Sequence, residues 1–437
     1  MTRSSIVKLR LSYKFAETIP VMRVFKFGGA SVKDADGIIN LYNIVTEETD
    51  RLVIIISAFG KTTNALERLH LAWRDSDPGF QSLFSEIMEY HLQVAEKLFG
   101  KMSPVLEMIN CIFLKFNDTL QRVKPDDFDH DYDMIVSNGE VWSTIIVEAY
   151  LRSRGLKSCW VDARELIITD GRHRDAGVIW KASQNAVKET IAFNDVDLYV
   201  TQGFIGATEE GEATTLGREG SDYSAAIFAN ILDARDVVVW KDVPGIMNAD
   251  PDWMPSAVIL PHVSYLEAAE MTYSGAKIIH PKTIKPLHNK KIPMLVKSFS
   301  DHRGAGTIIS DDAPHGEMCP VYVKKEGQIL ISLIPKDLSF VMGENLSSLF
   351  LLIAQSGLKV NLVQTGAVSI NICADNEEPK ISEVMEEMKQ EYSILYNEGV
   401  EMLTVRHCTD EAAMMVAGTR EVFLSQRTRN TVRMVVR

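Results

Sequence analysis

One pattern recurs along the first two thirds of the chain: an apolar run, then a glycine-rich turn, then a stretch with helical spacing. The first copy predicts a strand over 23–27, the turn GGAS at 28–31 and a helix to about Glu48. The second begins with LVIIISA at 52–58, a run typical of a strand buried on both faces of a parallel sheet. A glycine turn that opens a helix directs backbone N–H groups at an anion. The repeat therefore predicts an α/β fold with a mainly parallel sheet and anion-binding turns.

The stretch 214–232, TTLGREGSDYSAAIFANIL, is the most informative of these turns. Two glycines bracket Arg218, and Ser221 and Asp222 then open an apolar run at helical spacing. A Ser-Asp pair in that place predicts a helix start, because its side-chain oxygens accept hydrogen bonds from backbone N–H groups. Arg218 offers a fork suited to carboxylate or phosphate, and Asp222 suits the orientation of a cation. An ordinary loop with a capped helix is the alternative.

Further elements follow from the same periodicity. We expect strands at 134–137, 157–163, 198–205, 237–242 and 294–298, the last closing this half of the chain, and helical stretches at 65–123, 141–151 and 265–273. Thr63 and Asn64 precede a helix, where they either cap it or contact a substrate. Glu140 stands at a helix start, where its carboxylate either interacts with the helix dipole or binds a substrate ammonium. Ser143 faces the same side one turn on.

Composition excludes several classes of protein. With 46 basic and 59 acidic residues the formal charge is −13, which argues against a nucleic-acid or anionic-membrane partner. The apolar runs are too short to span a bilayer. The five cysteines form no CxxC pair, so we expect no disulfide framework, no zinc site and a reducing, cytoplasmic setting. Residues 1–21 are basic and predict a disordered N-terminal extension, with a transit peptide as the alternative.

The composition changes at 310–320 (SDDAPHGEMCP), which predicts a linker. Beyond it the periodicity predicts strand 329–334, helix 346–356, strands 358–364 and 368–374, helix 381–392 and strand 401–407. That βαββαβ order is typical of a ferredoxin-like unit. A helix at 411–416 and β runs at 422–426 and 432–436 predict part of a second unit. We therefore expect one domain over 22–310 and another over 311–437.

Charged residues gather near the predicted strand ends of the first domain: Lys26, Arg218, Lys277, Glu140, Asp222, Asp242 and Asp250. Ligands of open α/β sheets bind at that edge. Converging positive charges with few histidines suit phosphoryl transfer, in which the protein positions groups and neutralises charge. Mg²⁺ would be held mainly by phosphates and water, so we expect no metal site made of protein side chains.

Seven motifs stand in order along the first domain: KFGGAS (26–31), SAFGKTTN (57–64), NGE with Ser143 (138–143), TQGFIG (201–206), TTLGREGSDYSAA (214–226), WKDVPGI…ADP (240–251) and YLEAAEMTYSGAKIIHP (265–281). Together they resemble the aspartate kinases of the amino-acid kinase family, over about 22–307. The C-terminal region resembles the ACT regulatory domains of that family. The resemblance implies a three-layer αβα sandwich followed by an ACT region.

The resemblance also implies an activity: the γ-phosphoryl group of ATP passes to the β-carboxylate of L-aspartate, giving 4-phospho-L-aspartate on the way to lysine, threonine and methionine. It assigns catalysis to Lys26 and Lys277, which contact the phosphates, with Asp222 orienting the catalytic lysine. Further nucleotide contacts fall to Gly28, Gly29, Ser31, Lys241, Asp242, Asp250 and Pro281. Aspartate contacts fall to Thr63, Glu140 (ammonium), Arg218 (carboxylate) and Ser221. A carboxylate is ionised at pH 7, so no general base is required.

The chain departs from the family pattern at several positions. Glu219 stands where members commonly have glycine, and Lys241 where they often have threonine. We expect the Glu219 side chain to point to solvent rather than to pair with Arg218. Lysine-sensitive members carry Thr-Ser-Glu where this chain has 365–367 (TGA), and an aspartate near Asn361. An effector's charged groups need partners, so the loss of these side chains argues against lysine inhibition and leaves the effector open.

The resemblance further implies a homodimer joined through the ACT sheets, with an amino-acid effector as a possible partner of that region. No Rossmann fingerprint follows, so we expect no fused homoserine dehydrogenase. One alternative is another kinase of the family, acting on glutamate, acetylglutamate or a nucleotide. A second is a catalytically inactive amino-acid sensor that keeps the fold. The presence of Lys26, Asp222 and Lys277 favours an active kinase.

Overall fold

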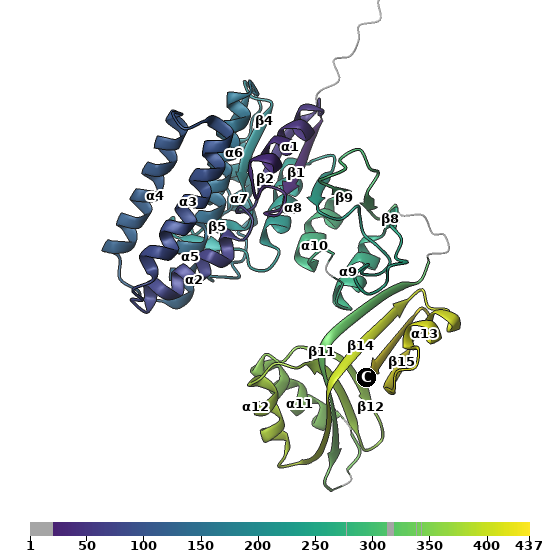
Figure 1. Ribbon diagram of the computed structural model, residues 1–437. Helices are drawn as coiled ribbons and strands as arrows, with labels where there is room; N and C mark the ends of the chain where they lie inside the picture. Colours follow the sequence, from purple (N-terminus) through teal and green to yellow (C-terminus); the bar gives the residue numbers. More distant parts are fainter. Residues whose placement is uncertain (1–20, 277, 313–318, 338, 342) are drawn as a thin grey trace, which may run out of the picture.

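The computed structural model describes residues 21–276, 278–312, 319–337, 339–341 and 343–437 (Figure 1). An eight-stranded sheet organises residues 22–309, and a six-stranded sheet organises residues 321–436. A separate hairpin pairs β5 (Ile205–Ala207) with β6 (Ala213–Thr215). Among the residues that the structure describes, no helix has the length and apolar character needed to span a membrane.

The eight-stranded sheet is mainly parallel, as the apolar runs predict. Its order is β3-β4-β2-β1-β7-β9-β10-β8, and only the pairing of β9 with β10 is antiparallel. The strands are β1 (Met22–Phe27), β2 (Arg51–Ile56), β3 (Ser158–Trp160), β4 (Leu198–Gln202), β7 (Val237–Lys241), β8 (His262–Val263), β9 (Met294–Ser298) and β10 (Thr307–Ile309). Strands β2 and β7 are buried over almost their whole length because their runs are apolar on both faces.

Helices cover both faces of this sheet, which confirms the predicted three layers (Figure 1). One buried cluster joins the sheet to α1 (Ala35–Thr46), α2 (Thr62–Arg74), α3 (Phe80–Phe99), α4 (Pro104–Arg122), α5 (Phe128–Val136) and α6 (Asn138–Ser153). A second cluster joins the opposite face to α7 (Trp180–Thr190), α8 (Gly220–Leu232), α9 (Tyr265–Tyr273) and α10 (Pro281–Lys290). A 3-10 turn, η1 (Ala163–Glu165), follows β3.

Four predicted strands of the first domain differ from the structure. The strand predicted at 157–163 is shorter, because β3 covers only Ser158–Trp160 and η1 begins at Ala163. Residues 134–137 are not a strand, because they belong to α5 and its C-cap, and Asp127 caps this helix by accepting from two backbone N–H groups. A short apolar run alone does not distinguish a buried helix from a strand. The predicted strand 198–205 ends at Gln202, and β5 begins at Ile205. The strand at 294–298 does not close this half of the chain, since β10 follows it.

The six-stranded sheet is antiparallel, in the order β12-β13-β11-β14-β16-β15. Its strands are β11 (Val321–Pro335), β12 (Val360–Thr365), β13 (Ile370–Asp375), β14 (Tyr392–Arg406), β15 (Val422–Arg427) and β16 (Thr431–Val436). Its helices are α11 (Gly343–Ser356), α12 (Lys380–Met388) and α13 (Asp410–Ala417). The βαββαβ order is confirmed, although the helix predicted to reach residue 392 ends at Met388. Strands β11 and β14 are 15 residues long, so β15 and β16 extend the same sheet.

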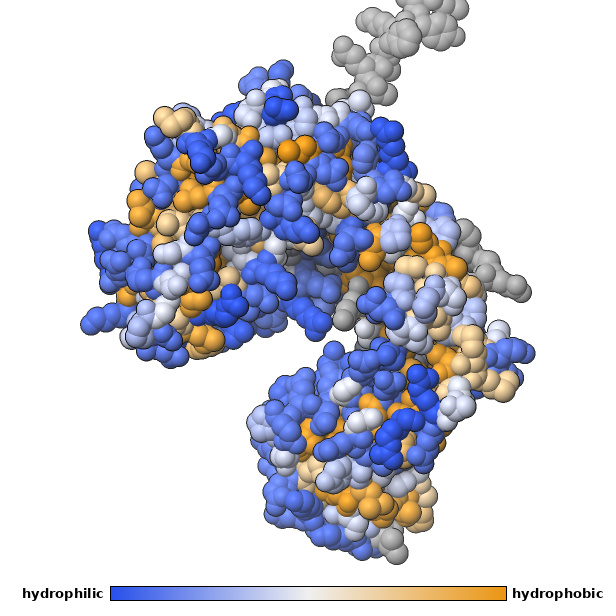
Figure 2. Space-filling view, in the orientation of Figure 1, coloured by the Kyte–Doolittle hydropathy of each residue, from blue (hydrophilic) through white to orange (hydrophobic). Residues whose placement is uncertain are grey.

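The six-stranded sheet contacts the first part of the chain through α9 and the loop after β7. Arg406, the last residue of β14, donates to Glu267 on α9. The start of β11 is also attached, because Tyr322 N donates to Asn248 O at 2.7 Å. Figure 2 shows mostly hydrophilic outer surfaces and an open groove between the two parts on the side away from these contacts.

Candidate active site

Two lysines converge on one buried carboxylate at the carboxyl ends of β1 and β7. Alternate residues of a strand point to opposite faces, and Phe25 and Phe27 pack on the α1 face, so Lys26 faces α8. Lys26 Nζ lies 2.6 Å from Asp222 Oδ1, and Lys241 Nζ lies 3.8 Å from Asp222 Oδ2. Burial alone would raise the pKa of Asp222, but the two ammonium charges bring it below its usual value. The cluster therefore holds one negative and two positive charges.

Asp222 lies in the first turn of α8, which begins at Gly220. The N-cap is Glu219, in a left-handed conformation with φ 55°, so the prediction that Ser221 and Asp222 cap the helix is wrong. Neither the Ser221 nor the Asp222 side chain accepts a hydrogen bond from a backbone N–H group at the start of α8. Asp222 instead pairs with a lysine, and Ser221 Oγ accepts a hydrogen bond from Ser57 Oγ at 3.0 Å.

The predicted glycine turn packs against the loop after β2. Gly60 N donates to Gly29 O at 2.9 Å, and a Cβ on Gly29 would lie 2.5 Å from a backbone oxygen of that loop. The nearest atom to a Cβ built on Gly28 is Lys26 Nζ, at 3.7 Å. Ser31, which closes the turn, is buried. The backbone of the turn thus lies open to the Lys26 ammonium, an arrangement suited to phosphate groups.

Glu140 lies buried at the start of α6. Its Oε1 accepts from Ala58 N at 3.3 Å, and its Oε2 has no hydrogen-bond partner among the described residues. Burial raises the pKa of Glu140 to about 8, so the group is mostly protonated at pH 7. Ser143 Oγ donates to Ser57 O at 2.9 Å, and Ser57 Oγ reaches Ser221. Residues 57–58 therefore connect Glu140, Ser143 and Ser221.

Thr63 and Asn64 lie in the first turn of α2, which begins at Thr62. Neither of them caps the helix, so that alternative is wrong. A Cβ on Gly139 would lie 3.3 Å from Thr62 Cγ2, so the starts of α2 and α6 are in close contact. This contact brings the N-terminal turn that contains Thr63 near Glu140.

Arg218 is exposed on the loop between β6 and α8. Gly217 before it has φ 76°, a conformation that favours glycine. Glu219 Oε2 is buried with no hydrogen-bond partner among the described residues, so the expectation that this side chain points to solvent is wrong. Burial lowers the pKa of His280, and the charges of Glu219 and Arg218 act on it in opposite directions. These three side chains therefore lie close enough to interact.

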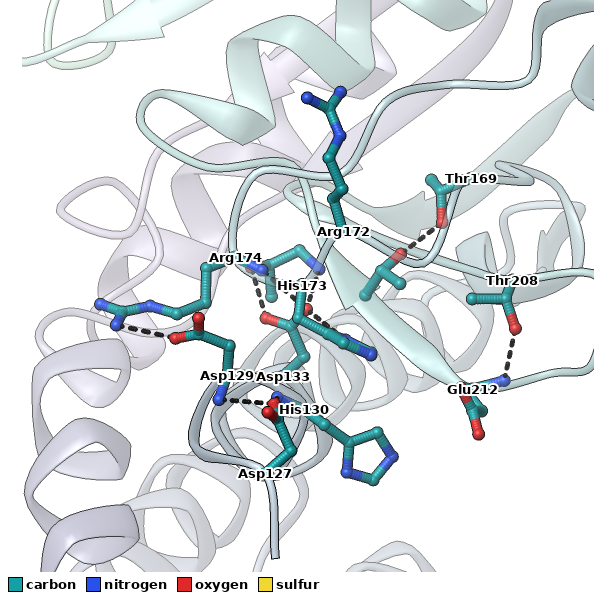
Figure 3. Close-up of polar contacts among 12 residues, drawn as sticks. Asp127, Asp129, His130, Asp133, Thr169, Arg172, His173, Arg174, Thr208 and Glu212 are labelled. Carbon is teal, nitrogen blue, oxygen red and sulfur yellow. Dashed lines mark hydrogen bonds and ion pairs between the residues drawn. The ribbon is translucent and has the colours of Figure 1, made fainter. Parts of the chain in front are cut away.

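Asp133 on α5, which the sequence analysis missed, ties three segments together (Figure 3). Asp133 Oδ2 accepts from Arg174 N and Thr215 N, both at 3.0 Å, and lies 3.1 Å from His173 Nδ1. Its Oδ1 accepts from Thr215 Oγ1 at 2.6 Å. Burial raises the pKa of Asp133, and these hydrogen bonds partly offset the rise. Since β6 ends at Thr215, Asp133 fixes the base of the loop that carries Arg218.

The loop 170–178 lies over the start of the Arg218 loop. Thr169 and Thr214 share a hydrogen bond of 2.7 Å between their hydroxyls, which fixes the base of the loop. A Cβ on Gly217 would lie 2.6 Å from Asp175 Oδ1, so the loop passes close to this glycine. Asp175 also forms an ion pair with Lys282 on α10. The loop therefore bridges β6 and α10 beside the acceptor residues.

Lys241 extends the lysine cluster toward α10, because its Nζ also donates to Ile278 O at 2.7 Å. The predicted catalytic residue Lys277, directly before this contact, lies outside the described residues. In the described part of the chain no group of three or more His, Cys, Asp or Glu side chains is placed to hold a metal ion.

The other predicted nucleotide residues, Asp242, Asp250 and Pro281, are exposed. Asp242 is exposed directly after β7, and Pro281 is exposed at the first position of α10. Asp250 lies further along the loop after β7, where its Oδ1 accepts from Asp252 N at 2.9 Å. The structure thus brings Lys26, Asp222 and Lys241 together and leaves Asp250 in a turn of its own.

Comparison with known proteins gives consistent matches. The model of the amino acid kinase family matches residues 22–298. Lysine-sensitive aspartokinase 3 of Escherichia coli is 30% identical over 361 residues, which cover 80% of this chain and 78% of that protein. The bifunctional aspartokinase/homoserine dehydrogenase 2, chloroplastic, of Arabidopsis thaliana is 27% identical over 391 residues, and this chain spans 42% of its length. The crystal structure of E. coli aspartokinase III with aspartate and ADP matches with a TM-score of 0.80 at 26% identity, covering 95% of this chain and 96% of that one.

Proposed function

The chain belongs to the amino acid kinase family and, within it, to the aspartokinases, and on this premise we propose that it is an ATP-dependent aspartate kinase. It transfers the γ-phosphoryl group of ATP to the β-carboxylate of L-aspartate, giving 4-phospho-L-aspartate. One observation carries the proposal: two lysine ammonium groups meet one buried carboxylate beside a glycine turn in which Gly29 has no room for a side chain. The complex of E. coli aspartokinase III with aspartate and ADP supports the choice of substrates.

The lysine cluster would bind the phosphates. The turn at Gly28, Gly29 and Ser31 cradles the terminal phosphates, with the glycine N–H groups as donors, and the ammonium groups neutralise the phosphate charge. Asp222 holds Lys26 Nζ at 2.6 Å, so this lysine is positioned before the nucleotide binds. Lys277 adds a further positive charge. ATP supplies the phosphoryl group, and these side chains stabilise the charge that develops during transfer.

The acceptor pocket is made by residues from three helix starts. Glu140 Oε2 has no hydrogen-bond partner among the described residues, and the ammonium group of the substrate would provide one. Arg218, exposed on its loop, offers a fork for a carboxylate. Thr63 and Ser221 complete the contacts. The β-carboxylate of aspartate is ionised at pH 7, so it attacks without a general base.

We assign the rim of the nucleotide site to Lys241, Asp242 and Pro281, with Asp250 further along the loop after β7. Mg²⁺ would be coordinated by phosphate oxygens and water rather than by a protein cage. The chemistry of the described residues fits this assignment, because Asp222, the buried carboxylate of the cluster, is occupied by lysines.

For the C-terminal region we propose an ACT-type regulatory role, with an amino-acid effector and a homodimer joined through the six-stranded sheets. Two observations support the dimer. Strands β12 and β15 are sheet edges, and Phe350 and Leu351 on α11 are 46% and 60% exposed. Light scattering behind size-exclusion chromatography tests it, and a monomer at micromolar concentration would refute it.

An ADP-release assay with a panel of acceptors tests the activity. We expect turnover with L-aspartate and none with L-glutamate, N-acetyl-L-glutamate or UMP. ADP release with another acceptor alone would support a different kinase of the family. No ADP release with any acceptor would support the inactive sensor.

An arginine pair provides the site control. Arg218→Leu should raise the KM for aspartate by about ten- to a hundredfold, because it removes a charge-assisted contact of about 1.5–3 kcal/mol. Arg68→Leu, on the exposed face of α2, should leave the KM unchanged. Equal effects of the two substitutions would remove Arg218 from the acceptor pocket.

A further inference from the structure

A cavity of about 280 Å³ lies where α9 meets the outer strands of the six-stranded sheet, and we call it the junction cavity. Polar side chains from both parts line it: Glu270, Arg406, Gln426, Thr428, Thr431 and Arg433. Figure 1 shows α9 beside the ends of β14 and β15. None of the residues assigned above to the candidate active site lines it. Its volume is just below the range of about 300–1,000 Å³ for small-molecule sites, so it suits a small ligand.

Arg406 forms a closed wall of the junction cavity. Its Nε and Nη2 donate to the two carboxylate oxygens of Glu267 at 2.7 and 2.8 Å, and its Nη1 donates to Glu270 Oε2 at 2.9 Å. The guanidinium is thus already neutralised and almost fully hydrogen-bonded. Arg406 fixes the geometry of the cavity and has little capacity left to bind an anion.

Arg433 on β16, in contrast to Arg406, has no carboxylate partner among the described residues. Its Nε is buried and has no hydrogen-bond partner among the described residues, and no described carboxylate lies within ion-pair distance of it. One face of the guanidinium is occupied, because its Cζ lies 5.4 Å from the centre of the Tyr273 ring. Arg433 is half-buried and lines the cavity, so the part of its guanidinium that faces the cavity presents a charged donor to it.

Glu270 supplies the complementary charge. Its Oε2 accepts from Arg406, whereas no described group contacts its Oε1. The side chain is 41% exposed, so Oε1 is accessible to a ligand. The hydroxyl groups of Thr428 and Thr431 add neutral polar contacts at the cavity wall. The junction cavity thus combines the guanidinium of Arg433, which has no ion-pair partner among the described residues, with the carboxylate of Glu270, of which only Oε2 is hydrogen-bonded.

We infer that the junction cavity is a binding site for a free α-amino acid, whose carboxylate pairs with Arg433 and whose ammonium pairs with Glu270 Oε1. A zwitterion satisfies both groups at once, whereas a simple anion would be repelled by Glu270 and a simple cation by Arg433. The small volume restricts the ligand to one amino acid with a modest side chain. The site lies within one chain, so binding needs no second copy of the protein.

Occupation of the cavity would act on the candidate active site through α9. Glu270 lies on this helix, and Thr272 Oγ1 near its C-terminal end donates to Ile279 O at 2.8 Å. The neighbouring Ile278 O accepts from Lys241, which belongs to the lysine cluster. A ligand that holds Glu270 would therefore change the KM for ATP. This second step rests on the proposed kinase function, whereas the binding itself does not.

Thermal-shift measurements on the full chain test the binding. The standard α-amino acids are screened one at a time, with propionate and n-butylamine as probes that carry one charge each. We expect at least one amino acid other than aspartate to raise the melting temperature of the wild type, and the single-charge probes to have smaller effects. Absence of any shift with every amino acid other than aspartate overturns the inference.

Three variants locate the site. Arg433→Met and Glu270→Gln should each weaken the binding measured by calorimetry about ten- to a hundredfold, and Arg433→Lys should weaken it less. Arg429→Met, an exposed arginine in the same hairpin and outside the cavity, should bind as the wild type does. Equal binding by Arg433→Met and Arg429→Met would overturn the assignment.

L-Aspartate provides the internal control. Its own shift should persist in Arg433→Met, which shows that this variant is folded and that the acceptor pocket is intact. If aspartate shifts no variant, including the wild type, the proposed kinase function fails while the cavity result still stands by itself.

Discussion

Replacing Glu140 by glutamine should stabilise the ligand-free protein at alkaline pH and remove the proposed contact with the substrate ammonium. The carboxyl group is buried, and Oε2 has no hydrogen-bond partner among the described residues. Burial raises its pKa from 4.5 to about 8. Glutamine has the same shape and stays neutral at every pH, so it imitates the protonated form of Glu140.

The magnitude follows from the shift in pKa. A rise from 4.5 to about 8 corresponds to about 5 kcal/mol, at about 1.4 kcal/mol for each unit. The folded state holds the proton more tightly than the unfolded state, so this stability is fully present below pH 4.5 and is lost as the pH rises through 8. The glutamine variant does not lose it. We therefore expect the two proteins to be equally stable near pH 4.5 and the variant to be several kcal/mol more stable at pH 9.

Urea unfolding of the ligand-free protein measures this difference. The fluorescence of Trp142, which is buried on α6 two residues from Glu140, helps to report the unfolding of that region. Glu107→Gln, on the exposed face of α4, is the control and should show no pH-dependent gain. A stability difference between the wild type and Glu140→Gln that does not change with pH would refute the reasoning.

The same group should make aspartate binding depend on pH. Only the ionised form of Glu140 attracts an ammonium, and with a pKa of about 8 the ionised fraction rises about fiftyfold between pH 6 and pH 8. The KM for aspartate should fall by about ten- to fiftyfold over that interval in the wild type. It should stay high and flat in Glu140→Gln. A falling KM in the variant would assign the ammonium contact to another residue.

Three other substitutions test the remaining contacts. Lys26→Met should abolish ADP release while circular dichroism stays unchanged. Addition of Asp222→Asn should recover stability but not activity, because Lys26→Met leaves the buried carboxylate with only Lys241, 3.8 Å away, and a buried carboxylate that loses its close partner costs up to about 3–5 kcal/mol. Asp133→Asn should raise the KM for aspartate more than the KM for ATP, whereas the exposed Asp129→Asn should change neither. Arg406→Gln should lower the free energy of unfolding by up to about 3–5 kcal/mol, since it leaves the buried carboxylate of Glu267 on α9 with only His407 beside it, and urea unfolding measures the loss.

Three outcomes would contradict these assignments. Retained turnover in Lys26→Met would remove that lysine from the mechanism. Equal effects of Asp133→Asn on both substrates would make Asp133 a residue of general stability. Unchanged unfolding of Arg406→Gln would mean that its contacts to α9 do not persist in solution.

The layered fold could be read from the sequence because apolar periodicity and glycine turns are local signals. The long apolar runs at β2 and β7 predicted strands, and the structure confirms both. The strand predicted at 134–137 was wrong because three apolar residues fit a strand and a helix equally well. The carboxylate of Asp127, which caps the helix, lies seven residues upstream. The extent of β11 and β14 was also hidden, since their polar middle residues interrupt the alternation.

The candidate site was only partly visible for a similar reason. Lys26 and Asp222 stand in recognisable turns, and the structure places them 2.6 Å apart. Asp133 gave no signal, because the groups it binds are 40 to 82 residues away in the chain. The inward turn of Glu219 depends on its left-handed backbone, which its residue type does not announce.

The two fifteen-residue strands give the C-terminal region the properties of a lever. At about 3.3 Å per residue each strand is about 50 Å long, and a tilt of about 5° at the α9 end would move the far end by about 4 Å. The lever is not uniform, because the pairing of β11 with β14 shifts register between Lys325 and Gln328, around Gly327 with φ 64°. A joint in the middle lets the distal half bend without moving the proximal half. Deletion of the residue that causes the register shift would remove this joint, and the two halves of the strand pair would then move together as one rigid arm.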